Sequence, residues 1–298
     1  MLVSITISFH PDLVLLRQQF DSLRGQVDRM LVIDNGSKNE VLESLRSLCQ
    51  AFGCTLHALG HNTGIAHAQN VGIQAAQQVG AKMLLLLDQD SIATPGMVKT
   101  LSRALEQHPR AAAAGPSSVD QRTGSHSFFV RDGYFGPRRW KPINIEKSEP
   151  IHVGFLIASG TLIRASALEN PEPMLASWFI DHVDTEWCLR IRSQGWTLLG
   201  VAQAQLQHQL GDKVSTIWLL RTRQVAHHSP LRDYYMFRNS ILLVHKRYTP
   251  WRWKVYFLAR LIQFSGFFLT FTPQRLTRFK MMAYGVLHGL QGRTGPWR

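Results

Sequence analysis

The N-terminal third of the chain alternates short apolar segments with longer amphipathic ones, and this alternation limits the available folds more than any other feature. The short segments have the length of buried strands, and the longer ones repeat their apolar residues with a helical period. Strands and helices at this spacing form a parallel sheet with right-handed crossovers and helices on both faces. We therefore expect an α/β, Rossmann-like fold with a mostly parallel central sheet. The expected strands are 2–9, 29–37, 54–60 and 81–90, and the expected helices are 11–26, 40–53 and 65–80.

Four consecutive leucines run directly into two aspartates in the stretch KMLLLLDQDSIATPG. An apolar run without alternation is typical of a parallel strand that is covered on both faces. Asp88 and Asp90 then lie at the carboxyl end of that strand, where open α/β sheets bind their ligands. Two neighbouring carboxylates repel each other unless a cation joins them, and a divalent cation bridged to a phosphate meets that need. A solvated loop that leads into the next helix is the alternative, and this stretch alone leaves both interpretations open.

Polar clusters also follow the second and third expected strands, in VIDNGS and HNTGIAHAQNVG. Each cluster alone is typical of an ordinary turn. Three clusters on successive strand ends favour a shared crevice, because the carboxyl ends of parallel strands meet at one edge of the sheet. Amides and carboxylates suit the edge of a nucleobase and ribose hydroxyls, and glycine permits close backbone approach. The expected lining residues are Asp34, Asn35, Asn62, Gly64 and Asn70.

The chain has 298 residues, of which 45% are hydrophobic, so it can bury a large core. We expect residues 1–240 to form one nucleotide-binding domain and residues 241–298 to form a separate helical tail. Three scattered cysteines without metal-site spacing indicate reduced thiols and a cytoplasmic location. The N-terminus has the pattern of a first strand and lacks the features of a signal peptide.

The excess positive charge is concentrated in the tail. The net charge is +13, the last acidic residue is Asp233, and residues 246–298 contain ten Lys and Arg. The longest uncharged run there, 261–274, is shorter than the roughly 20 apolar residues that a membrane span needs. This pattern predicts amphipathic helices that bind an anionic membrane surface. Packing against the core or in an oligomer is the main alternative, and nucleic-acid binding is not expected without a recognised motif. The residues expected to reach the lipid are Phe264, Phe267, Phe268 and Phe271.

Six motifs, in order and at their spacings, resemble glycosyltransferase family 2, and within it the bacterial rhamnosyltransferases that use dTDP-L-rhamnose. The motifs are VIDNGS, NTGIAHAQNVGI, LLLLDQDS, ASGTLI, FIDHVDTEWCLR and SPLRDYYMFRN, and the tail HGLQGRTG is similar to the GLxGRxG stretch of the same subgroup. The resemblance covers nearly the whole chain. It implies a GT-A fold and inverting, metal-dependent transfer of L-rhamnose from dTDP-β-L-rhamnose. It also implies a lipid-linked glycan acceptor in lipopolysaccharide, O-antigen or other cell-surface polysaccharide synthesis, at the cytoplasmic face of the inner membrane.

The resemblance also implies roles for single residues. Asp88 and Asp90 match the DxD motif, which holds Mg²⁺ or Mn²⁺ against the donor diphosphate. His208 matches a histidine that approaches the metal or the diphosphate in related enzymes. Asp184 matches the catalytic base, although Val183 stands where the family has glutamate. Inverting transfer needs one carboxylate to deprotonate the acceptor, and Asp181 and Glu186 are the alternatives for it.

The segment SPLRDYYMFRN resembles the part of the subgroup that closes over the donor, where cationic groups help the diphosphate to leave. A solvated helix face is the alternative for each of its residues. Two further functions remain open: the same fold with a different nucleotide sugar, and a membrane-peripheral binding protein that has lost catalysis. The oligomeric state does not follow from the sequence. The implied donor-binding residues are Arg232, Tyr234, Tyr235, Arg238 and Asn239.

Overall fold

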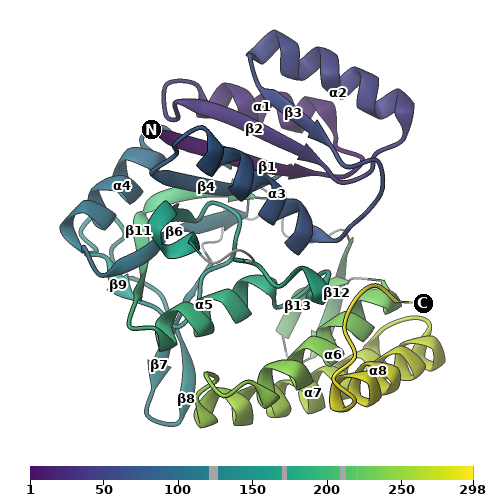
Figure 1. Ribbon diagram of the computed structural model, residues 1–298. Coiled ribbons are helices and arrows are strands. Elements are labelled where there is room, and N and C mark those ends of the chain that lie inside the picture. Colours follow the sequence, from purple (N-terminus) through teal and green to yellow (C-terminus); the bar gives the residue numbers. More distant parts are fainter. Residues whose placement is uncertain (121–126, 170–172, 209–212, 220, 228, 298) are drawn as a thin grey trace.

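The computed structural model describes residues 1–120, 127–169, 173–208, 213–219, 221–227 and 229–297, with only the backbone at 120, 208, 213–219 and 221–227 (Figure 1). Within these residues, nine strands form the central sheet, in the order β3-β2-β1-β4-β10-β6-β11-β5, with β9 paired to β11. The four strands at one end are all parallel, as expected from the sequence. They are β1 (Leu2–Ser8), β2 (Arg29–Asp34), β3 (Thr55–Ala58) and β4 (Met83–Asp88).

The other half of the sheet is mixed. Strand β11 runs parallel to β6, whereas β10 lies antiparallel between β4 and β6, and β5 and β9 are antiparallel to β11. Asp88 is the last residue of β4, and Asp90 lies in the turn between β4 and β5. The bounds are β5 (Ser91–Ala93), β6 (Ala111–Asp120), β9 (Ile151–His152), β10 (Leu162–Arg164) and β11 (Thr197–His208).

Helices cover both faces of the sheet, which confirms the expected α/β fold (Figure 1). The four-leucine strand shows how: Leu84 and Leu86 pack in the core cluster of α3 and α5, and Leu85 and Leu87 pack in the cluster of α4. Helices α1 and α2 pack together over the side of β2 that carries Val32. The bounds are α1 (Leu13–Leu23), α2 (Asn39–Phe52), α3 (Ile65–Gln78), α4 (Met97–Gln107) and α5 (Val183–Ser193).

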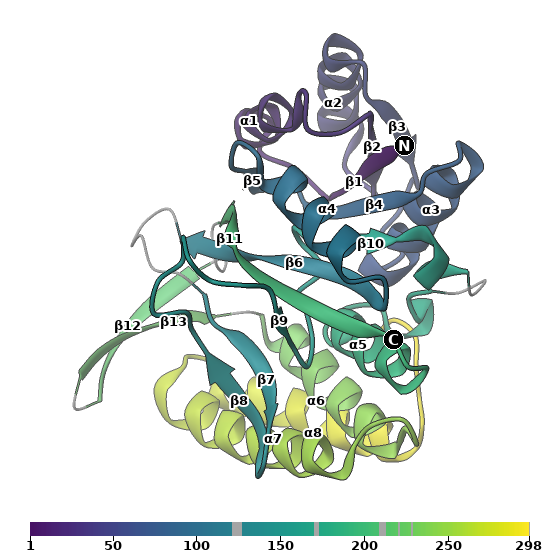
Figure 2. The same cartoon turned by 90° about the vertical axis from the view of Figure 1, so that its left-hand side faces the viewer.

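Shorter elements connect the sheet to the C-terminal part of the molecule. Two antiparallel hairpins, β7 with β8 and β12 with β13, project from the sheet region (Figure 2). The short helices η1 and η2 precede α5. The bounds are β7 (Phe129–Gly133), β8 (Gly136–Trp140), β12 (Lys213–Leu219), β13 (Arg221–His227), η1 (Ala165–Leu168) and η2 (Ala176–Trp178).

The tail consists of two helices that pack on a third. Helices α7 (Trp251–Phe271) and α8 (Arg275–Leu290) contact α6 (Pro230–His245), so the domain boundary expected after residue 240 falls inside α6. Trp253 and Phe257 belong to the main core, which joins the start of α7 to the sheet and its helices. Searched over its described part, the chain has no helix with the length and apolar character of a membrane span.

The four phenylalanines expected to reach a lipid surface are mostly used for this packing. Phe268 is buried, and Phe264 and Phe267 are partly buried against the cluster that joins α6, α7 and α8. Phe271 is 39% exposed. The expectation was wrong for Phe268, which is buried among residues of α6 and α8. For the partly exposed Phe264, Phe267 and Phe271, a contact with lipid stays a prediction.

Candidate active site

The two aspartates of the DxD motif lie where β4 ends and turns into β5: Asp88 is the last residue of β4, Asp90 lies in the turn, and both are half-buried. The side chain of Gln19 in α1 fixes this turn through hydrogen bonds. Its side-chain amide donates to the carbonyl oxygens of Asp88 (2.6 Å) and Ser91 (2.7 Å), and its Oε1 accepts from the hydroxyl of Thr6 (2.8 Å). Gln19 is fully buried. Because both ends of the turn are fixed by one side chain, the two carboxylates have a defined backbone geometry.

Ser159 holds the same turn from the other side. The Oγ of Ser159 accepts a hydrogen bond from the backbone amide of Asp88 (2.9 Å) and lies 2.7 Å from the Oγ of Ser91. The neighbouring residue, Ala158, donates its backbone amide to Oδ2 of Asp184 (3.3 Å). Two consecutive residues of one loop therefore connect the DxD turn to the expected catalytic base.

Asp184 lies in the first turn of α5. Its Oδ1 accepts hydrogen bonds from the amide (2.7 Å) and the hydroxyl (3.3 Å) of Thr185. Burial raises the pKa of the Asp184 carboxyl, the hydrogen bonds from Thr185 and Ala158 oppose this rise, and the nearby charge of Asp181 adds to it. A raised pKa makes a carboxylate a stronger proton acceptor, which suits a general base.

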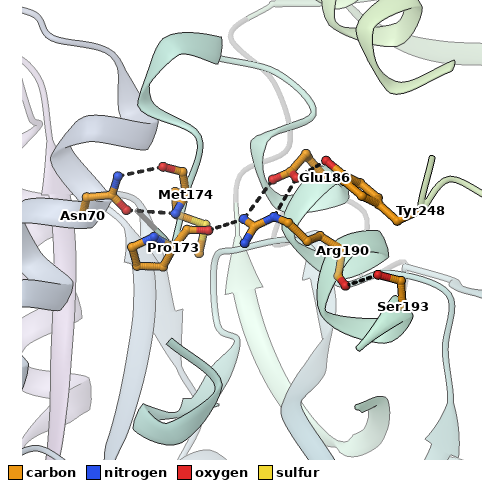
Figure 3. A network of polar contacts seen from close by, with 7 residues as sticks. All are labelled: Asn70, Pro173, Met174, Glu186, Arg190, Ser193 and Tyr248. Atoms are coloured by element: carbon orange, nitrogen blue, oxygen red, sulfur yellow. Dashed lines mark hydrogen bonds and ion pairs between the residues drawn. The ribbon is translucent and has the colours of Figure 1, made fainter. Parts of the chain in front are cut away.

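The two alternative bases are engaged elsewhere. Asp181 forms an ion pair with Arg232 (2.8 Å). Glu186 is fully buried, binds Arg190 with both carboxylate oxygens (2.8 and 3.1 Å) and accepts a hydrogen bond from the hydroxyl of Tyr248 (Figure 3). Within the described residues, Asp184 has no recorded ion pair. The geometry therefore favours Asp184 over both alternatives.

The polar residues after β2 and β3 form one connected network. Asn35 accepts hydrogen bonds at Oδ1 from the amide (2.9 Å) and hydroxyl (3.0 Å) of Thr63, and its Nδ2 donates to Asn62 (3.3 Å). Asn62 in turn accepts from the amide of Gly64 (2.9 Å). The sequence correctly grouped Asn35, Asn62 and Gly64, although their roles toward a donor stay predictions.

Asp34 is buried and its carboxylate is used within its own turn. It accepts hydrogen bonds from the amides of Gly36 (3.2 Å) and Ser37 (2.8 Å), and from the hydroxyls of Ser37 (2.5 Å) and Ser8 (3.3 Å). This carboxylate shapes the loop that follows β2. A direct contact of Asp34 with a donor stays a prediction.

Asn70 of α3 forms its hydrogen bonds with the backbone of Met174. Its side-chain amide donates to the carbonyl of Met174 (2.7 Å), and its Oδ1 accepts from the amide of Met174 (2.9 Å) (Figure 3). This paired contact assigns Asn70 to the anchoring of the segment before η2. A direct contact of Asn70 with a donor stays a prediction.

Four residues of α6 differ from their predicted role. Arg238 and Asn239 are fully buried and donate to backbone carbonyls, and Tyr234 and Tyr235 use their hydroxyls within the C-terminal region. Tyr235, Arg238 and Asn239 support the loop before α5, and Tyr234 contacts α8 and Trp297. These groups are therefore used within the protein and are not offered to a donor. Arg232 differs, since its side chain is 35% exposed beside Asp181.

The side chain of His208 lies outside the described residues. Its backbone pairs with Ser91 of β5, which brings the end of β11 next to the DxD turn. Among the residues with described side chains, no group of three or more His, Cys, Asp and Glu forms a metal site.

Sequence analysis missed two residues of this site, Gln19 and Ser159. A polar side chain on the apolar face of an expected helix was a signal for Gln19, because such a group needs a buried partner. The stretch ASGTLI contained Ser159, but only the fold shows that it meets the DxD turn.

Comparisons with known proteins agree with this geometry. The model of the family described as "Glycosyl transferase family 2" matches residues 4–170. A dTDP-rhamnosyl transferase of Shigella flexneri, RfbF, is 28% identical over 295 residues, which cover 99% of this chain and 97% of that protein.

Solved structures share the fold at low sequence identity. The crystal structure of GalNAc-T7 with UDP, GalNAc and Mn²⁺ aligns with a TM-score of 0.61 and 15% identity over 98% of this chain, which spans 56% of the GalNAc-T7 chain. The structure of S. aureus TarS 1–349 in complex with UDP-GlcNAc aligns with a TM-score of 0.57 and 13% identity, over 98% of this chain and 92% of that one. The fold is therefore the GT-A fold that the resemblance implied. Since the family model covers more than half of the chain, this protein belongs to glycosyl transferase family 2.

Proposed function

We propose that this protein transfers L-rhamnose from dTDP-β-L-rhamnose, with inversion, to a sugar hydroxyl of a lipid-linked glycan. The observation that carries this proposal is the pair of contacts from Ala158 and Ser159, which connect Asp184 to the DxD turn. The similarity to a dTDP-rhamnosyl transferase over nearly the whole chain supports the choice of donor. Lipopolysaccharide, O-antigen or other cell-surface polysaccharide synthesis is the proposed pathway class.

Asp184 is the proposed catalytic base. As the acceptor oxygen attacks the anomeric carbon, its proton passes to the Asp184 carboxylate, and the bond from that carbon to the diphosphate oxygen breaks on the opposite face. Arg232, held by Asp181, supplies a cation that can bind the departing diphosphate. The remaining polar network, Asn35, Asn62 and Gly64, is the proposed contact region for the nucleoside.

Mg²⁺ or Mn²⁺ is the proposed cofactor, and the donor set fits it. Asp88 and Asp90 offer two half-buried carboxylates on a turn that Gln19 and Ser159 fix. Mg²⁺ prefers one or two carboxylates together with substrate phosphates, and GalNAc-T7 was crystallised with Mn²⁺ and UDP. When bound, such an ion would neutralise charge on the diphosphate. His208 remains a proposed further ligand.

A screen of nucleotide sugars tests the donor. The purified protein is incubated with dTDP-L-rhamnose, UDP-GlcNAc and other nucleotide sugars, with and without Mg²⁺ or Mn²⁺, and thermal stability and nucleotide release are measured. Preferential, metal-dependent stabilisation by dTDP-L-rhamnose supports the proposal, because a ligand of the folded state raises its apparent stability. Preferential stabilisation by another nucleotide sugar would assign that sugar as the donor. Donor binding without sugar transfer to an acceptor or to water would favour a binding protein that has lost catalysis.

We also propose that α7 and α8 dock the protein on the cytoplasmic face of the inner membrane. The side chains of Trp251, Ile262 and Leu276 are 68%, 76% and 79% exposed. Along α7, Trp251, Val255, Leu258 and Ile262 share one exposed helix face. Together with the basic residues of the tail, this surface is typical of helices that bind anionic lipid.

The β7–β8 hairpin extends the proposed membrane surface. Tyr134 and Phe135 at its tip are 78% and 95% exposed. The guanidinium of Arg252 in α7 lies 5.2 Å from the centre of the Tyr134 ring, so the tip adjoins the start of α7. Aromatic side chains beside arginine suit the boundary between lipid head groups and acyl chains.

A further inference from the structure

The last residues of the chain leave α8 and return toward the loop before α5 (Figure 1, Figure 2). We call residues 292–297 the C-terminal strap. Gly289, just before it, allows α8 to approach α6, since a Cβ there would come within 2.9 Å of the carbonyl oxygen of Arg238. Gly292 and Gly295 have φ of +69° and +88°, a region that other residues rarely adopt. The glycines of HGLQGRTG therefore bring the strap to its position.

The strap forms contacts with two parts of the molecule, η2 and α6. The amide of Gly295 donates to the carbonyl of Ser177 (2.5 Å), and its carbonyl accepts from Nη1 of Arg238 (2.6 Å). The amide of Trp297 donates to the hydroxyl of Tyr235 (2.7 Å). The Trp297 ring packs edge-on against Tyr234, with ring centres 4.5 Å apart. The strap thus joins η2 to α6.

Two of the α6 residues that hold the strap, Arg238 and Tyr235, also hold the loop after η2. Nη2 of Arg238 donates to the carbonyl of Trp178 (2.9 Å), and the ring of Tyr235 stacks on that of Phe179 at 5.1 Å. Nδ2 of Asn239 donates to three backbone carbonyls in and around this loop, those of Trp178 (3.1 Å), Ile180 (2.8 Å) and Asp181 (2.9 Å). Arg238 therefore binds the strap and this loop at once.

The loop needs such support because its backbone is strained. Phe179, Asp181 and His182 have φ of +68°, +63° and +60°. Each non-glycine residue in this region costs on the order of 1–3 kcal/mol, and such conformations persist only where the surrounding structure fixes them. The loop ends two residues before Asp184, and its Asp181 carries the ion pair with Arg232.

We propose that the C-terminal strap is a positioning element for the catalytic base. By fixing Arg238, Tyr235 and the carbonyl of Ser177, it keeps the strained loop in the one conformation that presents Asp184 and Asp181 to the site. The inference rests on the proposed function only for the identity of Asp184 as the base. It gives the HGLQGRTG stretch, far from the DxD turn in sequence, a direct part in the active-site geometry.

Two full-length variants test the strap, each with a matched control. Trp297→Ala removes the ring packing, and Gly295→Val forces a β-branched residue into a left-handed conformation. Trp251→Ala controls for loss of a tryptophan. Gly25→Val controls for the backbone strain, since Gly25 has φ of +72° and open space around it. Hydrogen–deuterium exchange of residues 176–186 and release of dTDP from dTDP-L-rhamnose in water are measured for all four.

We expect faster exchange in residues 176–186 of both strap variants and unchanged exchange in β1 to β4. We also expect kcat to fall about 10- to 100-fold at an unchanged KM for the donor, as misplacement of a catalytic group does. The controls should match the wild type in the exchange of this loop. Unchanged exchange in 176–186, an equal rise throughout the sheet, or an unchanged kcat would overturn the proposal. If the wild type releases no dTDP, the turnover arm tests the proposed function and not the strap, and the exchange measurement alone decides on the strap.

Discussion

Ser159 accepts a hydrogen bond from the backbone amide of Asp88 at 2.9 Å, one residue after the amide that binds Asp184. This short connection sets the spacing between the DxD turn and the base. Proton abstraction and diphosphate departure require groups on two sides of the anomeric carbon. A small shift in this loop would therefore move the Asp184 carboxylate relative to the DxD carboxylates. The contact yields the first prediction.

Ser159→Ala should lower kcat while the fold stays intact. The partly buried amide of Asp88 and the buried hydroxyl of Ser91 each lose a partner, which costs on the order of 1–3 kcal/mol of stability. Denaturant unfolding measures the stability loss, and donor turnover measures the catalytic one. Ser44→Ala, at an exposed position of α2, is the control. Wild-type values of both quantities in the Ser159 variant would refute the positioning role.

Asp184→Asn should keep donor affinity and lose turnover. The amide has nearly the same volume but cannot accept the acceptor proton, and loss of a general base typically costs about 10²- to 10⁴-fold in rate. Binding of dTDP by calorimetry and rate of sugar transfer or donor hydrolysis are compared. Asp21→Asn, at an exposed position of α1, serves as the control. Near-normal turnover would return the role to Asp181.

The pH dependence should reflect the raised pKa of Asp184. The carboxylate form is needed as the base, so kcat/KM should fall with acid at a pH above the ordinary aspartate range. For stability the sign is opposite: the folded state holds the proton more tightly than the unfolded state, so the contribution of Asp184 decreases as pH rises through the raised value. At neutral pH the Asp184→Asn variant carries no buried charge at this position, so its free energy of unfolding should recover part of this loss. A pH profile with an acid limb at the ordinary aspartate value would contradict this.

Asp90→Ala should abolish the metal dependence of dTDP binding. The residue lies in the turn after β4 and outside the core clusters, so the melting temperature without ligand should change little. Thermal shift with dTDP, in the presence and absence of Mn²⁺, measures the effect. Persistent metal-dependent stabilisation in this variant would mean that the ion binds elsewhere.

The proposed membrane surface should bind anionic vesicles in a salt-sensitive manner. Each Lys or Arg near such a surface contributes roughly 1 kcal/mol, screened by salt, and the exposed apolar side chains add a salt-resistant part. Exchanging Trp251 and Ile262 for serine should weaken sedimentation with vesicles containing phosphatidylglycerol. Phe264→Leu, inside the tail cluster, is the control. Equal binding to anionic and neutral vesicles would remove the electrostatic part of the proposal.

Local patterns in the sequence determined the fold class and the position of the DxD turn. The leucines of β4 predict a strand buried on both faces, and a parallel sheet then places Asp88 and Asp90 at its ligand-binding edge. The same reasoning grouped Asn35, Asn62 and Gly64, because neighbouring parallel strands end together. These conclusions needed only periodicity and strand order.

The tertiary structure alone decided which polar residues face the site and which hold it. Asn70, Arg238 and Asn239 bind backbone groups that lie 104, 60 and 61 residues away in sequence, and no local pattern encodes such partners. Helix α6 is buried on nearly all sides, so its periodicity does not tell which neighbour each polar side chain meets. The position of the strap also depends on the tertiary structure. Trp297 meets Tyr235 because α7 and α8 pack on α6, and this packing places the strap beside the loop before Asp184.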